Sequence, residues 1–170
     1  FKKWEGKRSA AQITEVKVLN EHGAKALGKP MGSYLTLEAD KLLMPDEDFH
    51  SEVSDELALL LKGLLKQKTV KNILVAGLGN QSVTPDSLGP RTVSNLCVSA
   101  EGLKAIAPGV MAQTGMETAR ILLGIIKEVQ PDLVIAIDAL AARSIRRLGT
   151  TIQVTDTGIH PGSGVGNHRH

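Results

Sequence analysis

Aromatic residues are scarce in this sequence, and the four that it has (two Phe, one Trp and one Tyr) all fall within the first 49 positions. From His50 onward, a core must therefore be built from Leu, Ile, Val, Ala and Met. That composition, together with 17 glycines, suits helices packed closely on a parallel sheet. It does not suit a β-sandwich or an aromatic platform for nucleic acid.

Cysteine is also nearly absent. Cys97 stands alone, which excludes an internal disulfide and fits a reducing compartment. No apolar run approaches the roughly 20 residues that a membrane span needs, and the N-terminus lacks the hydrophobic stretch of a secretory signal. The net charge of +2 is too small to indicate nucleic acid or an anionic membrane as a partner. We expect a soluble, cytoplasmic chain with one domain over residues 1–170.

Apolar patterning predicts both helices and strands. Helices are predicted over residues 45–67 and 114–130, where apolar residues recur at helical spacing. Residues 20–33 carry turn-forming residues instead. The predicted strands are residues 12–19, 34–39, 72–80, 132–140 and 150–158. Their order favours an α/β fold with a mostly parallel central sheet and helices on both faces.

Two aspartates stand out because each follows a predicted buried strand. Asp86 comes after the turn that ends the first apolar strand, and Asp138 ends the second. The carboxyl ends of neighbouring strands border the crevice where α/β sheets bind ligands. Apolar neighbours should raise the pKa of Asp138, and two carboxyl groups with different pKa values can serve as acid and base. Both could instead be structural, with Asp86 capping a helix and Asp138 bonding to a nearby backbone N–H.

Other motifs are weaker. Gly77, Gly79 and Asn80 form a glycine turn after a strand, but Ser82 stands where a dinucleotide-binding motif needs its third glycine. The tripeptide that begins at Asp156 matches pepsin-like proteases, which need two such motifs in β-rich lobes. Asp156 nevertheless ends a predicted strand and is a candidate to line the site. His160 follows the same strand, where a structural role competes with a catalytic or metal-binding one.

Long segments resemble the germination proteases of spore-forming bacteria, enzymes that degrade small acid-soluble spore proteins. The most specific are "PDLVIAIDALAARS" and "QVTDTGIHPGSGVGN", and matching stretches run in family order from about Ile13 to Asn167. The resemblance implies an atypical aspartic endopeptidase that cuts after Glu, is made as a zymogen, forms a homotetramer, works in the spore core and needs no cofactor. It implies a fold similar to the hydrogenase maturation proteases, which hold a metal with two carboxylates and a histidine.

The family's two implicated carboxylates fall on Asp86 and Asp138, which the strand-end argument also selects. We assign the general-acid role to Asp138 and the base role to Asp86. Backbone N–H groups from Gly77 to Asn80 are candidates to stabilise an oxyanion, and Arg143 is a candidate to bind the substrate Glu. Asp156 and His160 are assigned supporting roles. No residue is assigned to a metal.

Two departures from the family pattern bear on these expectations. The segment between "NLCV" and "APGVM" is shorter than usual, and family members continue past "GSGVGN". The domain is therefore expected to be incomplete at its C-terminus. Two alternatives stay open: a metal-assisted hydrolase that uses Asp86, Asp138 and His160, and a non-catalytic relative that acts as a binding domain.

Overall fold

The computed structural model describes residues 1–65, 69–142 and 144–159. They form two compact units, and each is described by itself. The first unit comprises Phe1–Lys68 and Ala142–Gly158, and the second comprises Thr69–Ala141 and Ile159–His170. In the last of these ranges, only Ile159 is among the described residues. The chain passes from the first unit to the second and returns, and a single protease domain remains a prediction.

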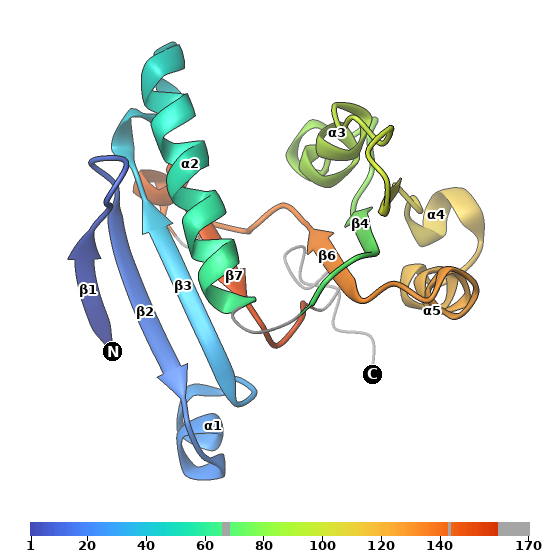
Figure 1. Cartoon of the computed structure of the whole chain (residues 1–170), viewed down its shortest axis with the longest axis horizontal. Helices are drawn as coiled ribbons and strands as arrows, with labels where there is room; N and C mark the ends of the chain where they lie inside the picture. Colours follow the sequence, from blue (N-terminus) through green and yellow to red (C-terminus); the bar gives the residue numbers. More distant parts are fainter. Residues whose placement is uncertain (66–68, 143, 160–170) are drawn as a thin grey trace. The chain divides into compact units, whose positions relative to one another are not determined.

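The first unit is built on an antiparallel sheet of four strands in the order β1-β2-β3-β7 (Figure 1). Helix α2 (Glu47–Leu64) confirms the first predicted helix and packs against one face of this sheet. The strands are β1 (Lys2–Glu5), β2 (Gln12–Val18), β3 (Gly32–Glu38) and β7 (Thr151–Thr155). Shorter helical segments are α1 (Glu21–Leu27), η1 (Asp40–Leu43) and η3 (Ile145–Arg147).

The core of this unit lies between α2 and the sheet. Alternation puts one side of β2 and β3 into the core, and α2 supplies a stripe at helical spacing. The buried apolar residues are Ala11, Ile13, Leu35, Leu37, Ala39, Phe49, Val53 and Leu60. Glu56 lies on the same stripe, 2% exposed, and accepts a hydrogen bond from the Arg8 N–H (2.6 Å). This bond ties the loop between β1 and β2 to the helix.

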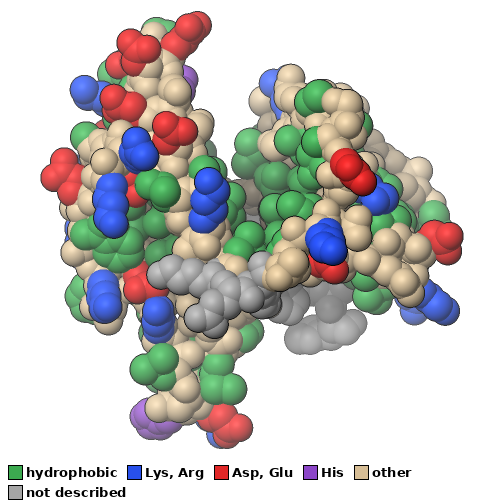
Figure 2. Space-filling view, viewed as in Figure 1, with side chains coloured by type: hydrophobic (Ala, Val, Ile, Leu, Met, Phe, Trp, Pro, Cys, Tyr) green, Lys and Arg blue, Asp and Glu red, His purple; other side chains and the backbone are tan. Residues whose placement is uncertain are grey.

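Acidic side chains gather where α2 begins, at one end of the first unit (Figure 2). Glu47 and Asp48 lie in the first turn, and Asp46 caps the helix by accepting the Phe49 N–H (3.0 Å). Negative charge at this end complements the helix dipole. The sequence therefore fixes where α2 starts.

The second unit contains a parallel sheet of three strands in the order β5-β4-β6. Helix α3 packs against all three strands. The strands are β4 (Ile73–Gly77), β5 (Leu103–Ile106) and β6 (Leu133–Ile137), and the helical segments are η2 (Thr84–Asp86), α3 (Leu88–Ser94), α4 (Met111–Thr114) and α5 (Thr118–Val129). Helix α5 confirms the second predicted helix. Within the described residues, no helix is long and apolar enough to cross a membrane.

The fold is therefore mixed α/β, and the prediction of one mostly parallel central sheet is wrong in part. β4 and β6 are parallel neighbours as expected, but β7 pairs antiparallel with β3 in the other sheet. The difference follows from patterning. "ILVAG" and "LVIAI" are continuous apolar runs, which suit a parallel strand, whereas "TIQVT" alternates polar and apolar residues as antiparallel strands with one open face do.

Asp132 joins the starts of β4 and β6. Its Oδ2 accepts hydrogen bonds from the backbone N–H groups of Asn72 (2.8 Å) and Lys71 (2.9 Å), which hold the pKa of Asp132 below its ordinary value. The backbone N–H of Asp132 in turn donates to the Asn72 carbonyl (2.9 Å). The carboxylate thereby sets the register at the amino ends of these strands.

We expect the hydrogen bonds that Asp132 accepts to make the stability of the second unit depend on pH. Because the folded pKa is lowered, the stabilisation is present above the unfolded pKa of about 3.9 and is lost as the pH falls through the folded pKa. Asp132→Asn should lower the urea midpoint at pH 7, and the difference from the unmodified chain should shrink below about pH 4. Urea titrations across this range measure it. A difference that stays constant with pH would contradict the assignment.

Candidate active site

The site is built at the carboxyl ends of β4 and β6. The two strands run parallel up to the pair Gly77 and Ile137, and the ladder is extended by the Leu78 N–H, which donates to the Ile137 carbonyl (2.8 Å). Asp138 follows directly and is half-buried. Its Oδ1 accepts the backbone N–H of Ala139 (2.8 Å). The strand-end position predicted for Asp138 is confirmed.

Asp86 reaches the same edge from the segment after β4. Its Oδ2 accepts the backbone N–H of Asn80 (2.8 Å), and the carboxylate is half-buried. Gly79 has φ 113°, a conformation that favours glycine, and the carbonyl of Asp86 occupies the space where a side chain at Gly79 would lie. The turn thus folds back tightly and holds Asp86 beside the end of β4. Asp86 ends the 3-10 turn η2, two residues before the first residue of α3.

Two further glycines let α3 approach the strand ends. A side chain at Gly77 would meet the backbone of Gly89, and one at Gly89 would meet the backbone of Leu78 and Ile137. The first residues of α3 therefore pack directly against Ile137, which precedes Asp138, and against Leu78 in the glycine turn. The backbone itself brings Asp86 and Asp138 to one sheet edge.

Asn80 links this turn to a residue that the sequence did not reveal. Its Oδ1 accepts hydrogen bonds from the side chain of Gln113 (3.0 Å) and from the Ser82 N–H (3.0 Å). Gln113 in turn accepts the backbone N–H of Val110 (3.3 Å). A chain of hydrogen bonds therefore runs from α4 through Asn80 to Asp86. Gln113 belongs to no recognisable motif, so its role could be found only from the fold.

Exposed apolar side chains flank the two carboxylates along the chain. Val83 (45% exposed) and Leu88 (53%) lie on either side of Asp86, and Leu140 (51%) follows Asp138. Apolar side chains are also prominent on the face of the second unit that Figure 2 shows. Both carboxylates therefore have exposed apolar neighbours along the chain.

Comparison with known proteins identifies the chain. The family model described as "Germination protease" matches residues 2–170. The chain belongs to the germination protease family. It is 49% identical to the germination protease of Caldanaerobacter subterraneus subsp. tengcongensis over 93% of this chain and 53% of the relative. It is 43% identical to that of Priestia megaterium over 97% of this chain and 49% of the relative.

The chain thus spans about half the length of these germination proteases. The family resemblance found in the sequence is confirmed. The family match over residues 2–170 includes the positions of both carboxylates and of the glycine turn. The activity and substrates of the complete relatives are taken up below as proposals.

Of the other candidate residues of this germination protease relative, one belongs to the first unit and two lie outside the described residues. Asp156 follows β7 in the first unit, and its Oδ1 accepts the Ser33 N–H (2.7 Å) at the start of β3. The expectation that its strand borders the parallel sheet is wrong, because β7 lies in the antiparallel sheet. Its supporting role stays a prediction. Arg143 and His160 lie outside the described residues, and their roles stay predictions.

The described residues contain no group of three or more His, Cys, Asp or Glu side chains that could hold a metal ion. The metal-assisted alternative needs His160 as a third ligand, so it stays open. Cys97 is exposed, and hydrogen bonds from Ser99 lower the pKa of its thiol.

Proposed function

We propose that this chain carries the catalytic groups of an endopeptidase that degrades small acid-soluble spore proteins during germination, with Asp86 and Asp138 as the catalytic pair. The observation that carries the proposal is that Asp138 directly follows β6, while the Asn80 N–H and the turn at Gly79 hold Asp86 beside the end of the neighbouring parallel strand β4. Membership of the germination protease family supports the choice of a peptide bond as the bond that is cut.

The two carboxyl groups provide acid and base without a covalent intermediate. Asp86 takes a proton from a water molecule, which attacks the peptide carbonyl carbon. Asp138, protonated, donates a proton to the leaving amine as the C–N bond breaks. Its position after the apolar strand β6 is the reason for this assignment. The two groups end with their protonation states exchanged, and a proton transfer through solvent resets them.

The glycine turn supplies the candidate oxyanion donors. The N–H of Leu78 is bonded to Ile137, and that of Asn80 is bonded to Asp86. This leaves the N–H of Gly79 as the candidate to bind the carbonyl oxygen as it gains charge. Val83, Leu88 and Leu140 would contact apolar residues of the substrate, and Arg143 remains the candidate for the Glu after which the chain is cut. A homotetramer in the spore core is the assembly and location that we propose from the family resemblance.

The proposal is tested by incubating the chain with a small acid-soluble spore protein and mapping the products by mass spectrometry. We expect new fragments that end in Glu. Activity should persist after exhaustive chelation; loss on chelation and recovery with a divalent metal would favour the metal-assisted alternative instead. A chain that binds the substrate without cutting it would favour the binding-domain alternative.

A further inference from the structure

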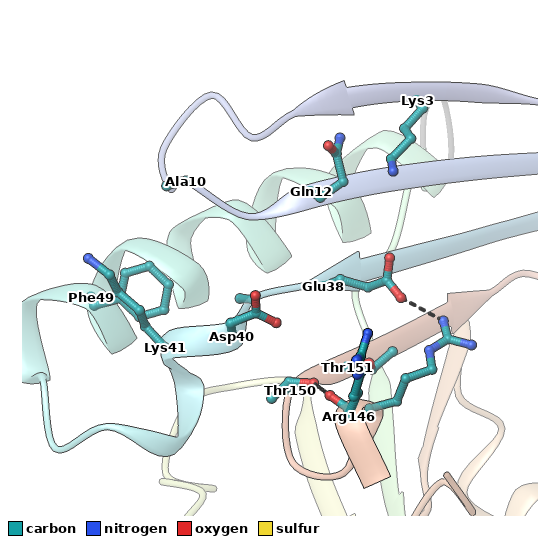
Figure 3. Close-up of a pocket in the computed structure, with 12 residues that line it drawn as sticks. Lys3, Ala10, Gln12, Glu38, Asp40, Lys41, Phe49, Arg146, Thr150 and Thr151 are labelled. Carbon is teal, nitrogen blue, oxygen red and sulfur yellow. Dashed lines mark hydrogen bonds and ion pairs between the residues drawn. The ribbon is translucent and has the colours of Figure 1, made fainter. Parts of the chain in front are cut away.

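A hollow of about 510 Å³ lies in the first unit, at the end of the sheet where β3 meets η1 (Figure 3). Its walls come from β1, β2, the end of β3, η1, α2 and the segment that leads into β7. All of its lining residues belong to the first unit. Nothing in the proposed catalytic mechanism uses this hollow.

Part of the wall is the polar face of the sheet. Gln12, Glu38 and Thr151 are register partners across β2, β3 and β7, so they form a row on one face. Their neighbours Ile13 and Leu37 point into the core on the other face. The row is thus turned away from α2. Within it, Gln12 donates to the Trp4 carbonyl and Glu38 pairs with Arg147, whereas the Thr151 hydroxyl has no partner among the described residues.

The hollow carries a surplus of positive charge. The basic side chains that line it are Lys3, Lys41, Arg146 and Arg147. The carboxylates that line it are those of Glu38 and Asp40. One ion pair is formed among them, between Arg147 Nη2 and Glu38 Oε1 (2.9 Å; Figure 3). Within the described part of the chain, Lys3 and Arg146 form no ion pair. The charge therefore favours an anionic ligand.

Two polar atoms at the hollow lack hydrogen bonds. Arg147 Nε and Thr151 Oγ1 are buried and have no partner among the described residues. Buried polar groups without partners are rare in folded proteins. The side chain of Arg147 is 40% exposed, so a rotation that releases Glu38 would turn its Nε–Nη2 edge toward a carboxylate entering the hollow. Such a ligand would supply the missing acceptor.

Size and chemistry distinguish a peptide side chain from an inorganic ion. The hollow lies in the range of pockets that bind organic ligands, and the Phe49 ring, Ala10 and Ala39 offer apolar wall for methylene groups. Glu38 and Asp40 would repel a dianion such as phosphate more strongly than a single carboxylate. We infer that this hollow binds an acidic side chain of a polypeptide, apart from the catalytic pair. That the polypeptide is a substrate rests on the proposed function.

The test measures binding without cleavage. A fluorescent peptide with two Glu residues, and a twin with Gln in their place, are titrated by anisotropy against the Asp138→Asn chain. We expect Arg146→Gln to weaken binding of the Glu peptide about 3- to 10-fold, with no change for the Gln peptide. Lys62→Gln removes the same charge from an exposed position on α2 outside the hollow and should leave binding unchanged.

Thr151→Val separates ligand binding from a structural role. It removes the unpaired hydroxyl, so it should raise the urea midpoint while weakening binding of the Glu peptide. Equal binding of the two peptides, or an equal loss in Lys62→Gln, would overturn the inference. Displacement of the peptide by inorganic phosphate but not by chloride at matched ionic strength would assign the hollow to a free anion instead. Cleavage by the unmodified chain is measured separately, so failure of the hollow and failure of the catalytic proposal are distinguishable.

Discussion

Replacing Asp138 by Asn should lower the rate of peptide hydrolysis by about 10²- to 10⁴-fold, the range contributed by a positioned general acid or base. The amide cannot donate the proton that the leaving amine needs. Its oxygen can still accept the Ala139 N–H, so the fold around the end of β6 should persist. Asp86→Asn should have a similar effect, because its amide oxygen can still accept the Asn80 N–H. Initial rates with a spore protein, together with urea midpoints, measure both effects.

Asp132→Asn is the matched control for this prediction. Asp132 directly precedes β6 and Asp138 directly follows it, so the same substitution is made at the two ends of one strand. At neutral pH, Asp132→Asn should cost stability and leave the rate of the folded protein unchanged. Because the catalytic pair acts as a unit, the double variant of Asp86 and Asp138 should be no slower than the worse single variant. Full activity in Asp138→Asn would refute the assignment.

The strand-end position of Asp138 could be predicted from the sequence because the signal is local. A continuous apolar run marks a buried parallel strand, and the polar residue that ends it must lie at the sheet edge, whatever the rest of the fold does. Strands β4 and β6 have that pattern, and their parallel pairing is confirmed. Partners that meet only through folding carry no such signal. The bond from Gln113 to Asn80 joins residues 33 positions apart and was missed.

Errors in the fold have similarly specific causes. Helix α1 differs from the predicted run of turns because seven residues that include Gly23 and lead into the glycine-containing segment 28–33 resemble turns, although Asn20 accepts the Gly23 N–H as its cap and Gly28 ends the helix with φ 61°. Strand β5 has four residues, too few for periodicity to identify. Strand β7 lies within a predicted strand, but its alternation is typical of an antiparallel strand and agrees with its pairing to β3. The hollow of the first unit is assembled from five separate stretches of chain, so no local pattern could predict it.

Gly89→Ala should destabilise the second unit and impair the site together. The added methyl group would lie 2.5 Å from the Ile137 carbonyl oxygen and 2.5 Å from the Leu78 nitrogen, the two atoms that form the hydrogen bond closing the strand ends. These are backbone atoms, which cannot move aside as the tip of a side chain can. Overpacking of this kind costs about 1–3 kcal/mol, and urea titration of the variant measures it.

Activity should fall further than stability alone explains. The methyl group would push α3 away from the strand ends and would thereby move Asp86 away from Asp138. A misplacement of about 1 Å can lower the rate by about 10²-fold. Gly124→Ala is the control in the same unit, because a side chain at this position in α5 would meet nothing within 4 Å. It should stabilise the chain by about 0.5–1 kcal/mol and leave the rate unchanged. If folded Gly89→Ala cuts substrate at the normal rate, close packing of α3 on the strand ends is not what holds the two carboxylates together.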